Sequence, residues 1–514
     1  MKPGEASDGR ERLTTGLLVS WLSQILLILS GFIVPRMIDD AMGAATLGIW
    51  DFGWSMVSYF GLIEGGIGSS VNRYVAVERG KGDQEGVNRI ASSAALIQRA
   101  VGSVVILLTI GLAWCIPYNL KDVGPELELQ ARWLVMLLGT ATGLTMFGAV
   151  FTGILTGCHR WATHHSIYAI TNILSVVAMV IALGLGFGII TLGVIQLCRE
   201  LLGRSLRVIY AYKACDGLRI SMRLADKSTI RSMLGFGGRM AIGRISRILL
   251  AQTSSILVMS FLGPAQLAMF VRPRSLVRQT SVFPQKFSFM LVPTVAAMVA
   301  ADKTREVREF VIKSSRTGLY MSAPLIALLA IGGPDLIHLW MGPDYANPWL
   351  IGLLTMALAS EVFYQPLDSL LIGLNLHGKP ALVMLGAALA GIIGSWVALS
   401  SGFGLIGVAV AIGIPWTFAH GVYLPLFTCK KLQIPPTEFF RSVWLGPLVA
   451  TLPFAGFLVA GRVIFPDRPI EALASGGLAG GAVLGVFYWC RVLPDSMKRK
   501  LISILAMRPN KGSI

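Results

Sequence analysis

Residues 232–301 read SMLGFGGRMAIGRISRILLAQTSSILVMSFLGPAQLAMFVRPRSLVRQTSVFPQKFSFMLVPTVAAMVAA, two long apolar segments joined by the turn Leu262-Gly263-Pro264-Ala265. No Asp or Glu occurs between Asp226 and Asp302, yet seven cations lie within the stretch. They are Arg239, Arg244, Arg247, Arg272, Arg274, Arg278 and Lys286. A cation in the middle of a bilayer costs roughly 2.5–3.5 kcal/mol on insertion scales. Seven of them without a local counter-ion predict a wet cavity that receives a large anion.

The spacing of these cations predicts one shared face on each segment. At 100° per residue, the three arginines of the first segment fall within roughly 140°, and the four cations of the second within roughly 160°. Four arginines lie too deep to reach the headgroups easily, and we expect them to bind the anion. These are Arg244, Arg247, Arg274 and Arg278. Lys286, Arg239 and Arg272 are expected to assist, although Arg239 and Arg272 lie near the expected helix ends and could reach lipid headgroups instead.

The composition is that of a polytopic membrane protein. Of the 514 residues, 54% are hydrophobic and only 14% are charged, where a soluble protein carries about 25% charged residues. We therefore predict an all-α chain of about fourteen transmembrane helices. They run approximately over 13–37, 44–70, 91–116, 131–156, 165–186, 189–211, 234–261, 266–299, 317–340, 348–373, 381–400, 404–428, 442–463 and 471–490.

The distribution of the +17 net charge predicts the orientation. Most Lys and Arg lie in the short loops that follow even-numbered spans, which is the positive-inside pattern rather than a nucleic-acid footprint. Both termini are therefore expected in the cytoplasm, and no nucleic-acid partner is expected. The loops on the other side are short, so any function must reside in the membrane or on the cytoplasmic loops.

An internal repeat relates the two halves at an offset of about 220 residues. Residues 42–50 parallel 262–270, the charged loop 82–89 parallels 302–309, and 186–190 match 402–406 at an offset of 216. Six spans return the chain to its starting side, so the halves share orientation about an axis near the membrane normal, and two such halves can alternate access. The expected parts are a cytoplasmic N-terminus (1–12), a six-helix bundle (13–213), a linker (214–233), a second bundle (234–428), two extra helices (429–490) and a cytoplasmic tail (491–514).

Several short motifs resemble oligosaccharide flippases, the polysaccharide-transport branch of the multidrug/oligosaccharidyl-lipid/polysaccharide (MOP) exporter superfamily. In the first half they are Leu47-Gly48-Ile49-Trp50, Gly61, Gly65-Gly66-Ile67-Gly68, Arg73-Tyr74-Val75-Ala76 and Lys81-Gly82-Asp83. In the second half they are Phe261-Leu262-Gly263-Pro264, Val292-Pro293-Thr294 and Leu339-Trp340-Met341-Gly342-Pro343-Asp344-Tyr345. One departure is Ala268-Met269-Phe270, where the family often has Gly followed by Tyr.

The resemblance implies two six-helix bundles arranged as a V around a cationic cavity, and a location in the bacterial inner membrane. It implies that an undecaprenyl-diphosphate-linked sugar repeat unit is flipped from the cytoplasmic to the periplasmic leaflet. Membrane lipid, a polysaccharide polymerase and a chain-length regulator are the further implied partners. Independently of the family, a lipid diphosphate is a compact anion with several charges, and Arg forks bind phosphate oxygens with two hydrogen bonds each.

Intramembrane carboxylates are candidates for gating or for coupling to H+ or Na+. They are Glu64, Glu361, Asp51 and Asp368, of which the first two are preferred. Pairing with the cavity arginines is the structural alternative.

No cofactor, metal site or catalytic residue is expected. The six cysteines include no CxxC pair, the histidine group at 159–165 lacks ligand-spaced carboxylates, and no phosphate-binding Gly-rich loop with a Lys occurs. A lipid II flippase remains an alternative, because its cargo also carries a diphosphate. A multidrug exporter of the same superfamily is disfavoured by the acid-free stretch. A membrane glycosyltransferase or polymerase is disfavoured by the short outer loops, and a major-facilitator sugar transporter by the absence of an Asp-Arg-x-Gly-Arg-Arg loop.

Overall fold

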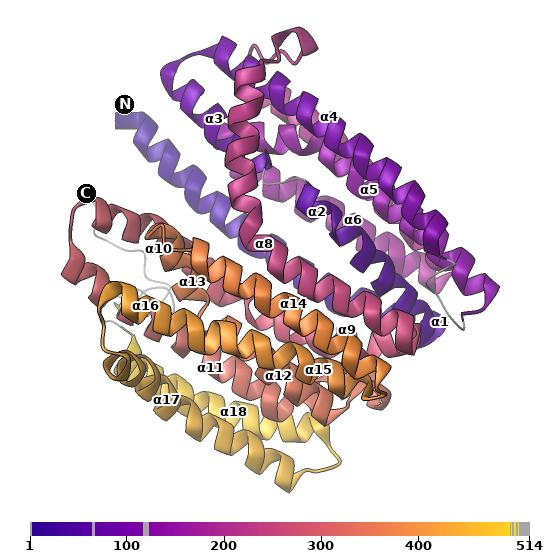
Figure 1. Ribbon diagram of the computed structural model, residues 1–514, viewed down its shortest axis with the longest axis vertical. Coiled ribbons are helices and arrows are strands. Elements are labelled where there is room, and N and C mark those ends of the chain that lie inside the picture. Colours follow the sequence, from indigo (N-terminus) through magenta and orange to yellow (C-terminus); the bar gives the residue numbers. More distant parts are fainter. Residues whose placement is uncertain are drawn as a thin grey trace. The chain divides into compact units, whose positions relative to one another are not determined.

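The computed structural model describes residues 3–63, 67–116, 123–493, 495, 498–499 and 502. Within these ranges, side chains are described except at 3–18, 67, 69, 236–244 and 283. All regular secondary structure of the described residues is helical, as expected from the composition (Figure 1).

The helices of the first part of the chain are α1 (Pro3–Ser58), α2 (Phe60–Ile63), α3 (Ile67–Lys81), α4 (Gln84–Cys115), α5 (Pro125–Gly157), α6 (Trp161–Gly184), α7 (Ile189–Ala214) and α8 (Lys227–Leu262). Those of the second part are α9 (Pro264–Thr280), α10 (Val282–Ala300), α11 (Thr304–Met341), α12 (Pro348–Phe363), α13 (Gln365–Gly373), α14 (Gly378–Ser400), α15 (Gly404–Thr417), α16 (Leu424–Leu432), α17 (Pro436–Ile464) and α18 (Pro469–Phe487). Short helical turns lie at Met222–Leu224, Pro343–Tyr345, Phe418–Tyr423 and Tyr488–Val492.

By length and composition, the described residues contain 11 helices that could cross a membrane, or 12 if one bent pair is a single span. The difference from the expected fourteen has three local causes. The helix Val19–Ile63 holds the first two expected spans, which meet at a kink at Gly43. Residues 264–300 form the bent pair α9 and α10. The expected span 189–211 corresponds to α7, whose charged residues Arg199, Glu200, Arg204 and Arg207 lower its hydropathy.

The chain divides into two compact units. The first comprises Met1–Val271 with Ala388–Val408, and the second Arg272–Ala387 with Ala409–Ile514. In the first unit α5 packs on α4 and α7, and α1 packs on α6 and α8. In the second unit α11 packs on α12 and α17, α10 on α13, and α17 on α18. Each unit has a buried apolar cluster, around Val75 and Leu155 in the first and around Leu367 and Leu424 in the second.

The turns between helices repeat in their backbone conformation. Five residues with positive φ recur 220 or 216 positions later. The pairs are Gly43 (80°) with Gly263 (83°), Gly82 (76°) with Asp302 (54°), His159 (57°) with Asn375 (56°), Gly186 (80°) with Gly402 (80°), and Gly217 (75°) with Gln433 (52°). The hydrogen bonds recur as well, since Phe187 N–H donates to the Ala182 carbonyl and Phe403 N–H to the Ala398 carbonyl, both at 2.9 Å. The repeat therefore extends from the sequence to the geometry of the turns.

Candidate functional site

The predicted cations lie on α8, α9 and α10. Arg239 and Arg244 are on α8, but their side chains lie outside the described part of the chain. Arg247, also on α8, is exposed and belongs to the first unit. The remaining four belong to the second unit, where Arg274 and Lys286 are half-buried. By their positions in the chain, the first three predicted cations belong to the first unit and the other four to the second.

Among the predicted cations whose side chains the structure describes, Arg272 is the buried one, with 4% of its surface exposed. Its guanidinium carbon lies 5.9 Å from the centroid of the Trp340 ring of α11. A cation over an indole face is stabilised by the ring quadrupole, by about 0.5–2 kcal/mol depending on desolvation. Arg272 therefore has a packing role that links α9 to α11, beyond the assisting role expected from its position in the sequence.

Arg278 is exposed, unlike the other three predicted cations of the second unit, and lies in the last turn of α9. The axis bends by 44° between α9 and α10. Just beyond Arg278, Ser281 donates to its carbonyl through the hydroxyl, at 2.7 Å, and through the backbone N–H, at 3.2 Å. Broken helices within a membrane span are found where the backbone lines a cavity or packs against protein. The bend thus places Arg278 at an interruption of the span.

Glu361 of α12 interacts electrostatically with Arg278. This half-buried carboxylate also accepts a 2.8 Å hydrogen bond at Oε2 from the indole Nε1 of Trp416. Trp416 itself is almost completely buried. Its ring lies 4.5 Å from that of His420, a residue of the π-helical turn Phe418–Tyr423. Such turns are rare in helices and are frequent at functional sites.

The other three predicted carboxylates lie in different surroundings. Glu64 falls outside the described residues. Asp51 on α1 is buried, with 7% of its surface exposed. Asp368 is half-buried in the first turn of α13, where the helix dipole favours a negative charge.

A cavity of about 600 Å3 lies within the first unit, between α1, α2, α4 and α8. Its lining is almost entirely apolar and includes Phe52, Leu108 and Ile256. The hydroxyl of Tyr59, which also lines the cavity, hydrogen-bonds with that of Thr253 at 2.5 Å. This contact joins α8 to the residue that separates α1 from α2.

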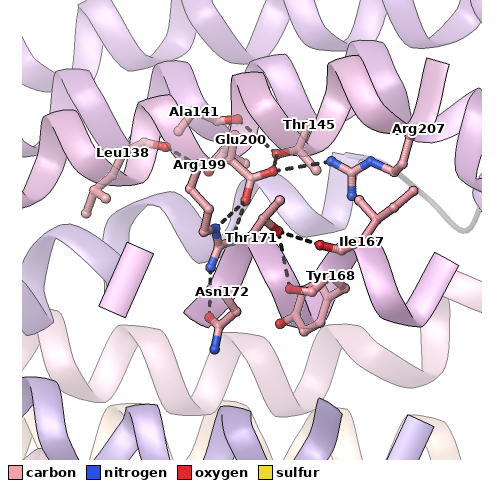
Figure 2. A network of polar contacts seen from close by, with 11 residues as sticks. Leu138, Ala141, Thr145, Ile167, Tyr168, Thr171, Asn172, Arg199, Glu200 and Arg207 are labelled. Atoms are coloured by element: carbon pink, nitrogen blue, oxygen red, sulfur yellow. Dashed lines mark hydrogen bonds and ion pairs between the residues drawn. The ribbon is translucent and has the colours of Figure 1, made fainter. Parts of the chain in front are cut away.

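A second group of charged side chains, not predicted as a site from the sequence, lies on α7 (Figure 2). Glu200 accepts from Arg199 Nε at 3.1 Å and from Thr145 Oγ1 at 3.0 Å, and its Oε2 lies 3.6 Å from Arg207 Nη2. These charged side chains are largely buried: 17% of the Arg199 side chain is exposed, 14% of Glu200 and 11% of Arg207. The sequence did contain a signal for this network, because three basic residues and one acid lie within the otherwise apolar segment 189–211.

The network extends to two further helices of the first unit. Arg199 Nη1 donates to Asn172 Oδ1 of α6 at 3.4 Å, and Asn172 Nδ2 donates to Ser30 Oγ of α1 at 2.8 Å. Glu200 therefore interacts with two arginines and a threonine. This arrangement ties α1, α5, α6 and α7 together, and it makes Glu200 a structural carboxylate.

The histidine and cysteine residues show no ligand cluster where the structure describes them. No group of three or more His, Cys, Asp or Glu side chains that could hold a metal ion occurs among the described residues. The rings of His164 and His165 lie 5.1 Å apart. All six cysteines are free thiols, and Cys158, Cys215 and Cys429 are buried.

The fold is that of the transporters of the MOP superfamily. An inward-facing multidrug resistance MATE family transporter of that superfamily matches with a TM-score of 0.69 at 14% identity, over 82% of this chain and 98% of that one. The lipid II flippase MurJ, in an inward closed conformation, matches with a TM-score of 0.67 at 15% identity, over 95% of this chain and 99% of that one. A MOP superfamily transporter from Pyrococcus furiosus matches with a TM-score of 0.63 at 13% identity, over 83% of this chain and 96% of that one. These neighbours are transporters and flippases, not enzymes.

The sequence itself assigns the family. Residues 85–348, more than half of the chain, match a family described as "Polysaccharide biosynthesis protein". This chain belongs to that family of polysaccharide biosynthesis proteins, and it is a multi-pass membrane protein. A search of curated proteins by sequence gives no match.

Proposed function

We propose that this protein is a flippase that moves an undecaprenyl-diphosphate-linked oligosaccharide, a repeat unit of O-antigen or exopolysaccharide, across the bacterial inner membrane. The cargo enters from the cytoplasmic leaflet and leaves to the periplasmic leaflet by alternating access of two six-helix bundles. The headgroup crosses the membrane bound to cationic side chains, while the polyprenyl tail stays in the bilayer. This route avoids the cost of placing an apolar chain in a polar site.

The observation that carries the proposal is the surplus of positive charge on α8–α10. These helices contain all seven predicted cations, and no acid occurs from Lys227 to Ala301. Arg247 and Arg278 are exposed, so their guanidinium groups can reach an anion. A diphosphate offers the planar oxygen pairs that guanidinium groups bind in a bidentate manner. Membership in the polysaccharide biosynthesis family supports a glycan as the rest of the cargo.

Under this proposal both termini lie in the cytoplasm, which agrees with the positive-inside pattern of the loops. A polysaccharide polymerase and a chain-length regulator are the proposed partners on the polymerisation side. Gating, or coupling to H+ or Na+, is proposed for the four carboxylates Asp51, Glu64, Glu361 and Asp368.

The test is flipping of a fluorescent undecaprenyl-diphosphate oligosaccharide in proteoliposomes. The variants are Arg244→Ala, Arg247→Ala, Arg274→Ala and Arg278→Ala. Arg305→Ala is the matched control, because Arg305 is 92% exposed and pairs with Glu309 on the loop-proximal turn of α11. We expect wild type and Arg305→Ala to flip the lipid and the four site variants to lose at least tenfold in rate, which corresponds to about 1.4 kcal/mol.

Two outcomes would contradict the proposal. Equal flipping by all folded variants would show that the arginines are structural or contact headgroups. Absence of flipping by wild type, with any diphosphate lipid, would show that the cargo is of another class.

Lipid II flipping is the second candidate function. The MurJ fold covers 95% of this chain, whereas the MATE and Pyrococcus furiosus structures cover 82% and 83%. Parallel assays with lipid II and with the oligosaccharide lipid separate the two cargoes. A multidrug exporter is less well supported, because cationic drugs require acidic side chains. The Pyrococcus furiosus relative is described as having a binding pocket of reverse polarity, suggesting a different function for that protein.

A further inference from the structure

The apolar cavity of the first unit opens along α4. Leu107 and Leu108 of this helix line the cavity and are exposed, the former by 67%, whereas Phe52 of α1 lines it and is only 1% exposed. By length and hydropathy, α4 can cross a membrane. In a bilayer its exposed leucines therefore face hydrocarbon, and the cavity extends from the lipid into the first unit.

The dimensions and the lining of the cavity suit a hydrocarbon chain. On α4 the lining runs from Leu107 to Cys115, a length of about 12 Å at 1.5 Å per residue. The volume of about 600 Å3 is roughly four times that of a dry apolar cavity that holds one benzene molecule. The hydroxyl of Tyr59 already hydrogen-bonds with that of Thr253. A polar ligand would lose its hydrogen bonds to water here, whereas an apolar chain loses none.

The cations of α8 do not share the face of the helix that borders the cavity. Ile256 lines the cavity from α8, and Arg247 precedes it by nine residues, a rotation of about 180° around the helix axis. A polyprenyl tail whose diphosphate lay on Arg247 would therefore begin on the opposite side of α8. This position favours a lipid of the surrounding bilayer as the occupant, rather than the tail of the proposed cargo.

The cavity lies toward one end of both helices. Cys115 is the last residue of α4, and Ile256 lies in the last two turns of α8. The positive-inside pattern assigns these two helix ends to the outer side of the membrane. The lipids nearest to the cavity are therefore those of the outer leaflet.

We propose that this cavity binds one acyl chain of an outer-leaflet phospholipid, with the headgroup near the Cys115 end of α4 and the chain directed toward Leu107. The bound chain contacts residues of α1, α4 and α8 at once, and it stabilises the folded first unit because it binds only where these helices are assembled. The site does not involve the cations that are proposed to bind the cargo, so it is independent of the identity of that cargo.

The experiment is photolabelling of the full-length protein in nanodiscs of phosphatidylethanolamine and phosphatidylglycerol. The probe is a phosphatidylethanolamine that carries a diazirine near the end of one acyl chain, and labelled residues are mapped by mass spectrometry. We expect label on Met56 and Ile256, which are half-buried and line the cavity from α1 and α8. Trp114 of α4 is 75% exposed and is not part of the lining. Its labelling measures ordinary contact with the bilayer.

Gly111→Leu is designed to fill the cavity. Gly111 lines it, and a Cβ atom at this position meets nothing within 4 Å. Leucine also has a higher helix propensity than glycine, so the variant should fold. We expect the label on Met56 and Ile256 to fall at least fivefold relative to that on Trp114. Gly111→Ala, which adds one methyl group, should fall between this variant and wild type.

Gly456→Leu is the matched control, because Gly456 of α17 is exposed and a Cβ atom there also meets nothing within 4 Å. This variant should leave the labelling pattern of the first unit unchanged.

Three results would overturn the inference. Wild type labelled at Trp114 but not at Met56 or Ile256 would show that the acyl chain stops at the protein surface. Undiminished label on Met56 and Ile256 in folded Gly111→Leu would show that the probe reaches them by another route. Loss of that label on addition of a small molar fraction of undecaprenol, with Trp114 still labelled, would identify the occupant as an isoprenoid chain. The flipping assay is a separate measurement, so its failure would overturn the proposed function and leave this result intact.

Discussion

Gly48 of α1 packs directly against the backbone of Pro264, the first residue of α9, so that a Cβ atom at position 48 would overlap the Pro264 carbonyl. The two residues belong to segments that are related by the internal repeat, 42–50 and 262–270. Gly43 and Gly263 form the corresponding turns, with φ of 80° and 83°. Glycine is therefore needed here for two reasons. Gly43 and Gly263 adopt a positive φ, and Gly48 allows the backbone of Pro264 to approach closely.

Gly48→Ala is predicted to destabilise the protein by about 1–3 kcal/mol, the usual cost of overpacking a tight contact. The reason is that the contact is with backbone, which cannot rotate away. Thermal unfolding in detergent measures the effect. Gly61→Ala on α2 is the control, because a Cβ at position 61 meets nothing within 4 Å. An equal loss for the two variants would contradict the contact.

Glu200→Gln is predicted to destabilise the first unit by about 3–5 kcal/mol, because it removes the carboxylate from two half-buried arginines. The comparison is Glu128→Gln, which breaks a more exposed pair with Arg132 on α5, 2.9 Å apart and four residues away. We expect less than about 0.5 kcal/mol there. Thermal unfolding measured for both variants decides whether the network on α7 holds the unit together.

Trp340→Leu is predicted to lower the free energy of unfolding by about 1 kcal/mol more than Trp340→Phe, because the phenyl ring keeps part of the attraction to Arg272. Arg272→Lys should show a smaller loss of stability than Arg272→Ala. Flipping by the folded Arg272→Lys protein should stay close to wild type. Loss of flipping without loss of stability would instead assign Arg272 to the cargo.

Asp226→Ala is predicted to fray the first turn of α8. The Asp226 carboxylate accepts from the Ser228 hydroxyl at 2.6 Å and from the Thr229 N–H and hydroxyl, each at 2.8 Å. Hydrogen exchange of residues 227–235 should accelerate in this variant and stay near wild type in Asp226→Asn, since Asn also caps helices. Equal exchange in the two variants would argue against the cap.

The same hydrogen bonds, first that of Ser228, hold the pKa of Asp226 well below its usual range. A lowered native pKa means that the cap contributes in full above about pH 4, the ordinary value for Asp. The contribution declines as the pH falls toward the native pKa. The difference in exchange between wild type and Asp226→Ala should therefore shrink in acid.

Much of the helical framework could be predicted from the sequence. Apolar segments of sufficient length are local features, and they predicted the all-α class and the positions of the membrane helices. The turns at Gly43 and Gly263 were also local, because glycine readily adopts positive φ. The helix α7 was predicted as well, but its four charges keep it out of the described helices that are apolar enough to cross a membrane.

The pairing of charges was decided by the tertiary structure. The stretch 232–301 contains no acid, and from the sequence Arg278 had no local counter-ion. Glu361, whose charge acts on Arg278, lies on another helix, and it accepts a hydrogen bond from Trp416 of a third. Likewise, Thr145 and Asn172 reach the charges of α7 from separate helices. Hydropathy and periodicity are properties of one segment, whereas an ion pair depends on which helix faces pack together, and that is set by long-range packing.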